Sequence, residues 1–302
     1  MGYERFAGDT VIVVRPIDVV STGALLSSNI AATDYAVYSA TTTYSVGSKV
    51  TFGDSNYEAL VAGAGYNIAD TSKWLELGAT NRTAAFDRVV GTQSKRTGLI
   101  TYRIQSDDLL SSIALLDVLA ATIRIKMTDA SAGVIYDKTT TMANSGVSEW
   151  HEYFFLDYQL NTDLVLTDLP AYAGALIDVD IAYQGVAAVG VILLGYHQWI
   201  GDAKYGIKVG IDDYSVKERR FDGSLVVNKG NYSARQNVAL EVPTGAVDEV
   251  SRLLTSMRSE LALYIAVDRF RCTYVYGFYR SFDLIIAGVD YSNCNLEIEG
   301  LI

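Results

Sequence analysis

Cysteine, histidine and proline are scarce in this 302-residue chain, which has two Cys, two His and three Pro. Cys272, Cys294, His151 and His197 are too few and too far apart to form a structural zinc site from neighbouring residues. They also leave few options for a Ser-His-Asp or Cys-His triad. We expect both cysteines to be buried free thiols; a disulfide across paired strands is the alternative.

Positive charge and long apolar runs are lacking too. The net charge of −11 and the pI of about 4.7 disfavour a nucleic-acid partner, because an acidic surface repels phosphate backbones. The longest apolar stretch, 186–196, is shorter than the ~20 residues that a membrane-spanning helix needs. Residues 1–9 are polar and resemble no signal peptide. We therefore expect a soluble protein with no membrane span that is not exported by the general route.

Hydrophobic residues make up half of the chain, and tyrosine is abundant, with 21 Tyr against nine Phe and three Trp. That composition suffices for sizeable cores and excludes wholesale disorder. At ~150 residues per domain, the length suggests about two domains, or three modules if the domains are small and all-β.

Short alternating segments predict a mainly β, multi-module fold. Residues 122–127 and 176–183 alternate between apolar and polar side chains, and 186–196 has the pattern of a buried central strand; 109–121 fits a helix or a strand. We expect four parts: an N-terminal β segment (1–34), a small carbohydrate-binding-like module with a connector (35–98), a β-sandwich resembling a jelly roll (99–215) and a C-terminal α+β assembly module (216–302).

The C-terminal part contains the clearest helical pattern. Apolar residues recur at positions 247, 250, 253, 254, 257, 261 and 264. This spacing predicts a helix over about 246–264 that covers one face of a sheet formed by strands around 225–242 and 272–299. Thr244 is the expected N-cap, and Asp248 and Glu249 suit the positive end of the helix dipole.

Residues 35–78 combine aromatic side chains with many turn signals. Val50, Phe52 and Tyr57 surround a Gly53-Asp54 turn, which predicts a tight hairpin. About 40 residues bury little core, so the large aromatics either form that core or remain exposed to a ligand. Aromatic rings suit sugars, whose C–H faces pack on π surfaces, and the candidate sugar-binding residues are Tyr44, Tyr57, Tyr66 and Trp74. We favour a core role for three of them and exposure for Tyr66, which follows the small 63–65 loop.

No pattern of catalytic residues stands out. The adjacent carboxylates Asp107/Asp108, Asp212/Asp213 and Asp248/Glu249 lie in no recognisable motif, and phosphate-binding glycine loops are absent. His151 and His197 stand beside aromatic residues, where a packing role is expected. We therefore expect no catalytic residue, no metal site, no cofactor and no polysaccharide hydrolase activity.

Two resemblances add to this. The stretch Tyr44-x-x-Gly47-x-x-Val50, with Tyr57-Glu58-Ala59 and Trp74, resembles the small carbohydrate-binding modules appended to chitinases. Nearly the whole chain resembles tail proteins of tailed bacteriophages that carry such a module. The motifs are Thr80-Asn81-Arg82, Phe86-Asp87, Lys204-Tyr205-Gly206, Asp213-Tyr214-Ser215, Tyr276-Gly277-Phe278-Tyr279 and Leu296-Glu297-Ile298-Glu299-Gly300.

The phage resemblance implies a tail-tip or baseplate protein of the virion, with a distal-tail-like position next to the tail tube, assembled in the host cytoplasm. It implies a three- or six-fold ring of identical subunits, with the tail tube and other tail-tip proteins as partners and a host cell-surface glycan as a further one. The alternatives are a non-catalytic cell-surface glycan-binding protein, an accessory module of a glycan hydrolase, and an interaction protein without sugar affinity.

Overall fold

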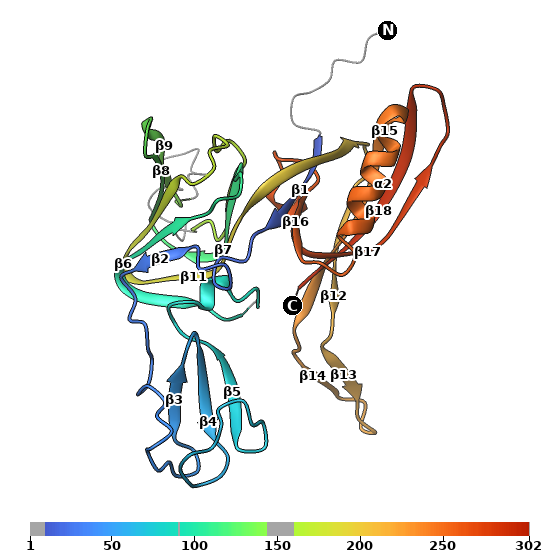
Figure 1. Ribbon diagram of the computed structural model, residues 1–302. Coiled ribbons are helices and arrows are strands. Elements are labelled where there is room, and N and C mark those ends of the chain that lie inside the picture. The colour runs from blue at the N-terminus through green and yellow to red at the C-terminus, as the bar shows by residue number, and fades with distance from the viewer. Residues whose placement is uncertain (1–9, 90, 144–159, 302) are drawn as a thin grey trace, which may run out of the picture. The chain divides into compact units, whose positions relative to one another are not determined.

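The computed structural model describes residues 10–89, 91–143 and 160–301 (Figure 1). The chain divides into two compact units. The sandwich unit is Ile17–Leu194, and the terminal unit combines the N-terminal segment up to Pro16 with the chain from Gly195 onward. Strands dominate both units, and α2 (Val247–Ser256) is the one α-helix among the described residues. The expectation of a mainly β, multi-module fold with one C-terminal helix is confirmed.

The sandwich unit is built around the first part of β11 (Leu176–Ala203), which pairs with β6 (Ser94–Gln105) on one side and with β8 (Thr122–Asp129) on the other over Leu176–Ala182. The register shifts between Ala182 and Val186. Further strands complete the layers: β2 (Leu25–Ser28), β7 (Ser112–Leu119), β9 (Gly133–Thr141) and β10 (Leu164–Leu166).

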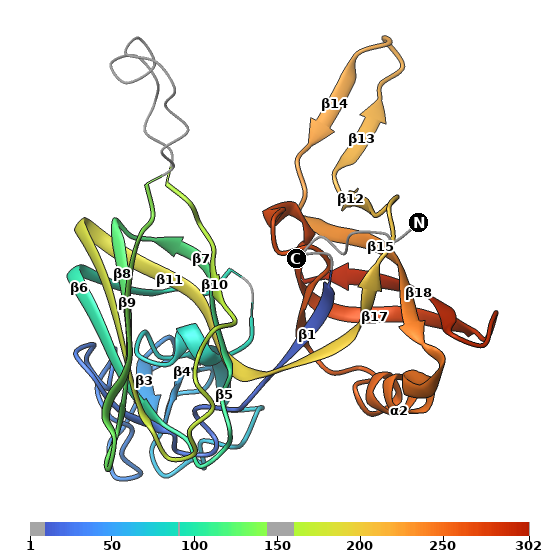
Figure 2. The same cartoon turned by 90° about the horizontal axis from the view of Figure 1, so that it is seen from above.

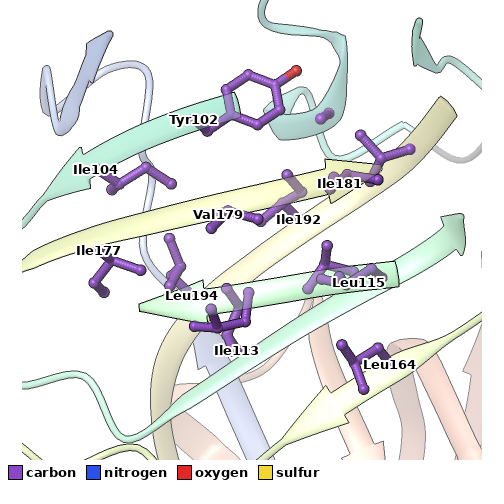
Figure 3. Close-up of a cluster of buried hydrophobic side chains, with 14 of the residues drawn as sticks. Tyr102, Ile104, Ile113, Leu115, Leu164, Ile177, Val179, Ile181, Ile192 and Leu194 are labelled. Carbon is purple, nitrogen blue, oxygen red and sulfur yellow. The ribbon is translucent and has the colours of Figure 1, made fainter. Parts of the chain in front are cut away.

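Alternation along these strands creates the core of the sandwich unit. Successive side chains of a strand point to opposite faces, and Ile177, Val179 and Ile181 of β11 are therefore all fully buried. Figure 3 shows them beside Tyr102 and Ile104 of the neighbouring strand β6, with side chains of β7 and β10 and of the later part of β11 on the opposing layer. The stretch 109–121, which fits a helix or a strand by pattern, forms β7.

A small three-stranded sheet within residues 17–194 forms a separate module with its own core. It consists of β3 (Lys49–Phe52), β4 (Ser55–Ala59) and β5 (Trp74–Ala79), in that order. The predicted hairpin at Gly53-Asp54 is confirmed, since Val50 pairs with Tyr57 and Phe52 with Ser55. Gly53 has a φ of +60°, which is a conformation that glycine adopts without strain. A short 3₁₀ helix, Ala84–Phe86, follows the module.

The terminal unit is an antiparallel sheet whose order is the end of β11, β1 (Thr10–Pro16), β16 (Ala262–Ile265), β17 (Tyr274–Ile285), β18 (Tyr291–Gly300), β15 (Tyr232–Pro243) and β12 (Lys208–Asp213). The sheet curves until β11 meets β15 at Asp202–Glu241 and Ala203–Leu240. The helix α2, labelled in Figure 2, belongs to this unit. Its side chains Val250 and Leu254 are part of the core of the unit. The short strands β13 (Val216–Arg219) and β14 (Leu225–Asn228) form a hairpin of their own.

The helix expected over 246–264 is shorter, which corrects that prediction. It ends at Ser256, and the backbone turns through Ser259, whose φ is +60°. Residues 262–265 are all apolar and fully buried because β16 is a central strand, paired on both sides. Thr244 is not the N-cap; it lies in a 3₁₀ turn (Thr244–Ala246), and its hydroxyl donates to the Gly288 carbonyl at 3.1 Å.

The division of the chain also differs from the expected parts 1–34, 35–98, 99–215 and 216–302. The N-terminal strand β1 belongs with the C-terminal unit, because it pairs with β11 over Thr10–Pro16 and with β16. β11 runs without a break from one unit into the next, so the boundary falls at Leu194/Gly195, inside the apolar stretch 186–196.

Candidate glycan-binding module and grooves

Trp74 forms the centre of the small module. Its side chain is only 3% exposed and packs with Val50, Ala59 and Ile68. The rings of Tyr38 and Tyr44 meet it edge-on, with centroids 5.6 and 5.3 Å away. Its indole Nε1 has no hydrogen-bond partner. A buried ring offers no face to a sugar, so Trp74 acts here as core.

The three tyrosines predicted as sugar-binding residues surround this core and are each half-buried: Tyr44, Tyr57 and Tyr66. The Tyr44 hydroxyl accepts a hydrogen bond from the Ser39 backbone N–H at 2.8 Å. The Tyr66 ring lies against Gly63 so closely that a Cβ there would come within 2.5 Å of it, and the Lys73 Nζ is 5.4 Å from its centroid. The structure therefore gathers all four predicted residues in one cluster.

Two other rings of the module are more exposed, and the sequence analysis did not single them out as ligand contacts. Tyr35 precedes the first strand, with the Lys49 Nζ 5.8 Å from its ring centroid. Phe52 stands at the hairpin turn and meets Tyr38 edge-on at 5.8 Å. The exposure of Phe52 could have been predicted from its position beside the turn, because residues at a hairpin tip contact few neighbours.

Two hollows lie in the described part of the terminal unit. The first, of about 260 Å³, lies between the segments 203–209 and 267–273 and is lined by Tyr205, Phe270, Arg269 and Cys272 among others. The second, of about 360 Å³, lies between α2 and residues 196–199 of β11. We call this second hollow the helix groove.

The two cysteines are both free, but only one of them is buried as expected. Cys294 lies in the core of the terminal unit, and burial raises the pKa of its thiol to about 11. Cys272 is exposed and lines the smaller hollow, because it sits in a short 3₁₀ turn (Arg271–Thr273) outside the strands. That position corrects the prediction of a second buried thiol.

The adjacent carboxylates occupy surface positions. Asp107 and Asp108 are exposed, as are Asp248 and Glu249 in the first turn of α2. Asp212 pairs with Arg235 at 3.3 Å and Asp213 with Lys217 at 2.9 Å. Hydrogen bonds from the Ser215 side chain and from Lys217 hold the pKa of Asp213 well below its usual value. These are the properties of surface ion pairs.

Of the two histidines, His197 lies in the described part of the chain. The ring of His197 stacks on Tyr196 at 5.9 Å, and His151 lies outside the described residues. Within residues 10–89, 91–143 and 160–301, no three His, Cys, Asp or Glu side chains are grouped so that they could hold a metal ion. In the same ranges, no helix has the length and apolar character needed to cross a membrane.

Comparison with known proteins gives no match: no family model, no curated protein and no solved structure is significantly similar to this chain.

Proposed function

We propose that the chain is a structural subunit of a bacteriophage tail tip or baseplate, a distal-tail-like protein that assembles into a ring of identical copies. The sequence motifs that resemble phage tail proteins support the class of particle. The observation that carries the assembly role is the edge strand β12, which pairs with β15 and with no other strand of the described chain.

Strand β12 has exposed apolar side chains on the face of the sheet that carries the core, where a monomer is expected to bury them. Val209 and Ile211 pair with Gln236 and Ala234. Gln236 is fully buried, so these side chains lie on the sheet face that carries the core. They are nevertheless 47% and 60% exposed. Exposed apolar strands at a sheet edge promote pairing with another chain, and monomeric proteins usually block them with charges or a cover.

A neighbouring copy that covers β12 accounts for this surface. A head-to-tail contact that covers this edge in every copy closes a ring when the rotation between copies closes. The proposed role is non-catalytic, and the carboxylates Asp212 and Asp213 form surface ion pairs in keeping with it.

The test is the mass of the purified full chain in solution, measured by sedimentation. We expect a three- or six-fold multiple of the 32.9 kDa subunit. Ile211→Lys should shift the protein toward monomer without lowering its melting temperature, because the side chain is already exposed. Val134→Lys, on a similarly exposed valine of β9, is the matched control and should assemble like the wild type. A monomeric wild-type protein, or undiminished assembly of Ile211→Lys, would contradict the proposal.

Glycan binding by the small module is the second candidate function, and the exposed rings of Tyr35 and Phe52 favour it. A glycan array probed with the full chain tests it. If the module binds sugar, Phe52→Ala should weaken the signal and leave melting unchanged, because the Phe52 side chain is exposed. Absence of any glycan signal would leave the module as a spacer.

A further inference from the structure

The hairpin of β13 and β14 is an exposed arm of the terminal unit. Its strands pair only with each other, and a two-stranded hairpin alone is marginally stable in water. Lys217 is opposite Val227 and Arg219 is opposite Leu225, so one face of the hairpin carries two cations and two exposed apolar side chains.

The tip of the hairpin holds an aromatic ring in a formed turn. Phe221 is fully exposed. The next residue, Asp222, accepts hydrogen bonds at its Oδ1 from the Ser224 N–H at 2.9 Å and from the Ser224 hydroxyl at 2.6 Å. The backbone of Arg220 is bonded to Ser224 and Gly223. A fully exposed ring on an ordered turn, beside two arginines, has the character of an anchor for another surface.

The helix groove has the complementary chemistry. Tyr196 and Trp199 are partly exposed at its strand side, and Val250 and Leu253 line its helix side. Glu249 supplies negative charge at the rim, next to Asp248 in the first turn of α2. Gln198 also lines the groove, but its Oε1 is buried away from the groove surface. The groove therefore suits an apolar ring flanked by cationic donors.

The arm cannot reach the groove of its own chain. The hairpin joins β15 at Tyr232, whereas α2 follows the other end of the strand, beyond Pro243. The 12 residues of β15 span about 40 Å. Both views show the hairpin and α2 at opposite ends of the terminal unit (Figures 1 and 2). A hairpin tip that fills the groove must therefore come from a second copy.

We infer that the hairpin tip of one copy docks in the helix groove of the next, with Phe221 against Tyr196 and Trp199 and with Arg219 and Arg220 facing Glu249. Two different surfaces meet in this contact, so it is head-to-tail, and it closes a ring when the rotation between copies closes. The inference rests on the proposed ring-forming function and adds a second contact between neighbours to the covered edge of β12.

Site-specific crosslinking tests the contact. In a Cys272→Ser background, Ser224→Cys marks the tip and leaves Phe221 in place, and Arg252→Cys marks α2 one turn from Glu249. A short bifunctional thiol reagent should link the double-cysteine chain into a ladder of oligomers. An equal mixture of the two single-cysteine chains should stop at dimers. The control replaces Arg252→Cys with Val134→Cys and should give no ladder.

Substitutions at the two surfaces test the chemistry. Phe221→Ala should weaken association by about tenfold or more, as expected for an interface anchor. Arg219→Glu with Arg220→Glu should abolish the ladder, and addition of Glu249→Arg to the same chain should restore it, whereas Lys at Val134 should change nothing.

The outcomes separate the two proposals. If sedimentation shows assembly but tip and groove do not crosslink, or if Phe221→Ala assembles fully, the inference is wrong and the ring function stands. If the chain is monomeric at its highest soluble concentration, both are wrong. Binding of oligosaccharides that changes Trp199 fluorescence, without crosslinking, would identify the groove as a sugar site and overturn the inference.

Discussion

Replacement of Trp74 by alanine should unfold the small module and leave both larger cores intact. Trp→Ala in a core costs about 3–5 kcal/mol, and the edge-on contacts with Tyr38 and Tyr44 contribute ~0.5–1.5 kcal/mol each to that cost. The indole Nε1 has no hydrogen-bond partner, so the loss of a hydrogen bond does not add to the cost of the substitution. A domain this small rarely has more than about 3–5 kcal/mol of stability, so the substitution removes all of it.

Limited proteolysis of the full chain, with mass spectrometry of the fragments, measures this directly. Trp74→Ala should expose new cleavage sites between residues 35 and 79 while the remaining fragments resist digestion. Leu75→Ala is the control. Leu75 is the next residue along the chain and its side chain is exposed, so this substitution should change the free energy of unfolding by less than about 0.5 kcal/mol. An unchanged cleavage pattern for Trp74→Ala would refute the assignment of Trp74 as the core of a marginal module.

Three further predictions concern other parts of the chain. Deletion of residues 38–78 should leave the rest folded, because the module core is separate from that of the sandwich; loss of cooperative melting would contradict this. A thiol reagent at neutral pH should label Cys272 at once and Cys294 only after unfolding, since burial raises the pKa of the latter to about 11; equal labelling rates would show that the core is open. Burial also raises the pKa of the Asp180 carboxyl in the folded chain. In the unfolded chain this carboxyl has its ordinary pKa of about 4, so it loses its proton at a lower pH there than in the folded chain. The free energy of unfolding therefore falls as the pH rises above about 4. Asp180→Asn should therefore melt higher than the wild type at pH 7 and equally at pH 3, and a lower melting temperature at pH 7 would contradict the sign.

Local patterns in the sequence predicted the elements that local physics decides. The Gly53-Asp54 turn specifies a hairpin because only a few residues pass through a positive φ without strain. Alternation over 176–183 fixed which side chains of β11 enter the core. The residues that cluster around Trp74 could be predicted, because so short a module has few other large side chains to bury.

The predictions from sequence that were wrong concern features that depend on contacts between residues far apart in the chain. Apolar positions 261 and 264 continue the helical spacing, but the pairing of residues 262–265 with β1 and β17 makes them a strand. The division into units could not be predicted, because β1 joins the C-terminal sheet across more than half the chain and β11 crosses the boundary without a turn. The helix groove likewise arises from β11 and α2, about 50 residues apart, and no local motif marks it.

The most direct test of the account is an electron-microscope image of the purified full chain, classified by symmetry. The account predicts closed rings of three- or six-fold symmetry, with the copies joined through their terminal units. Particles with the size of a single chain, or open aggregates without symmetry, would contradict it.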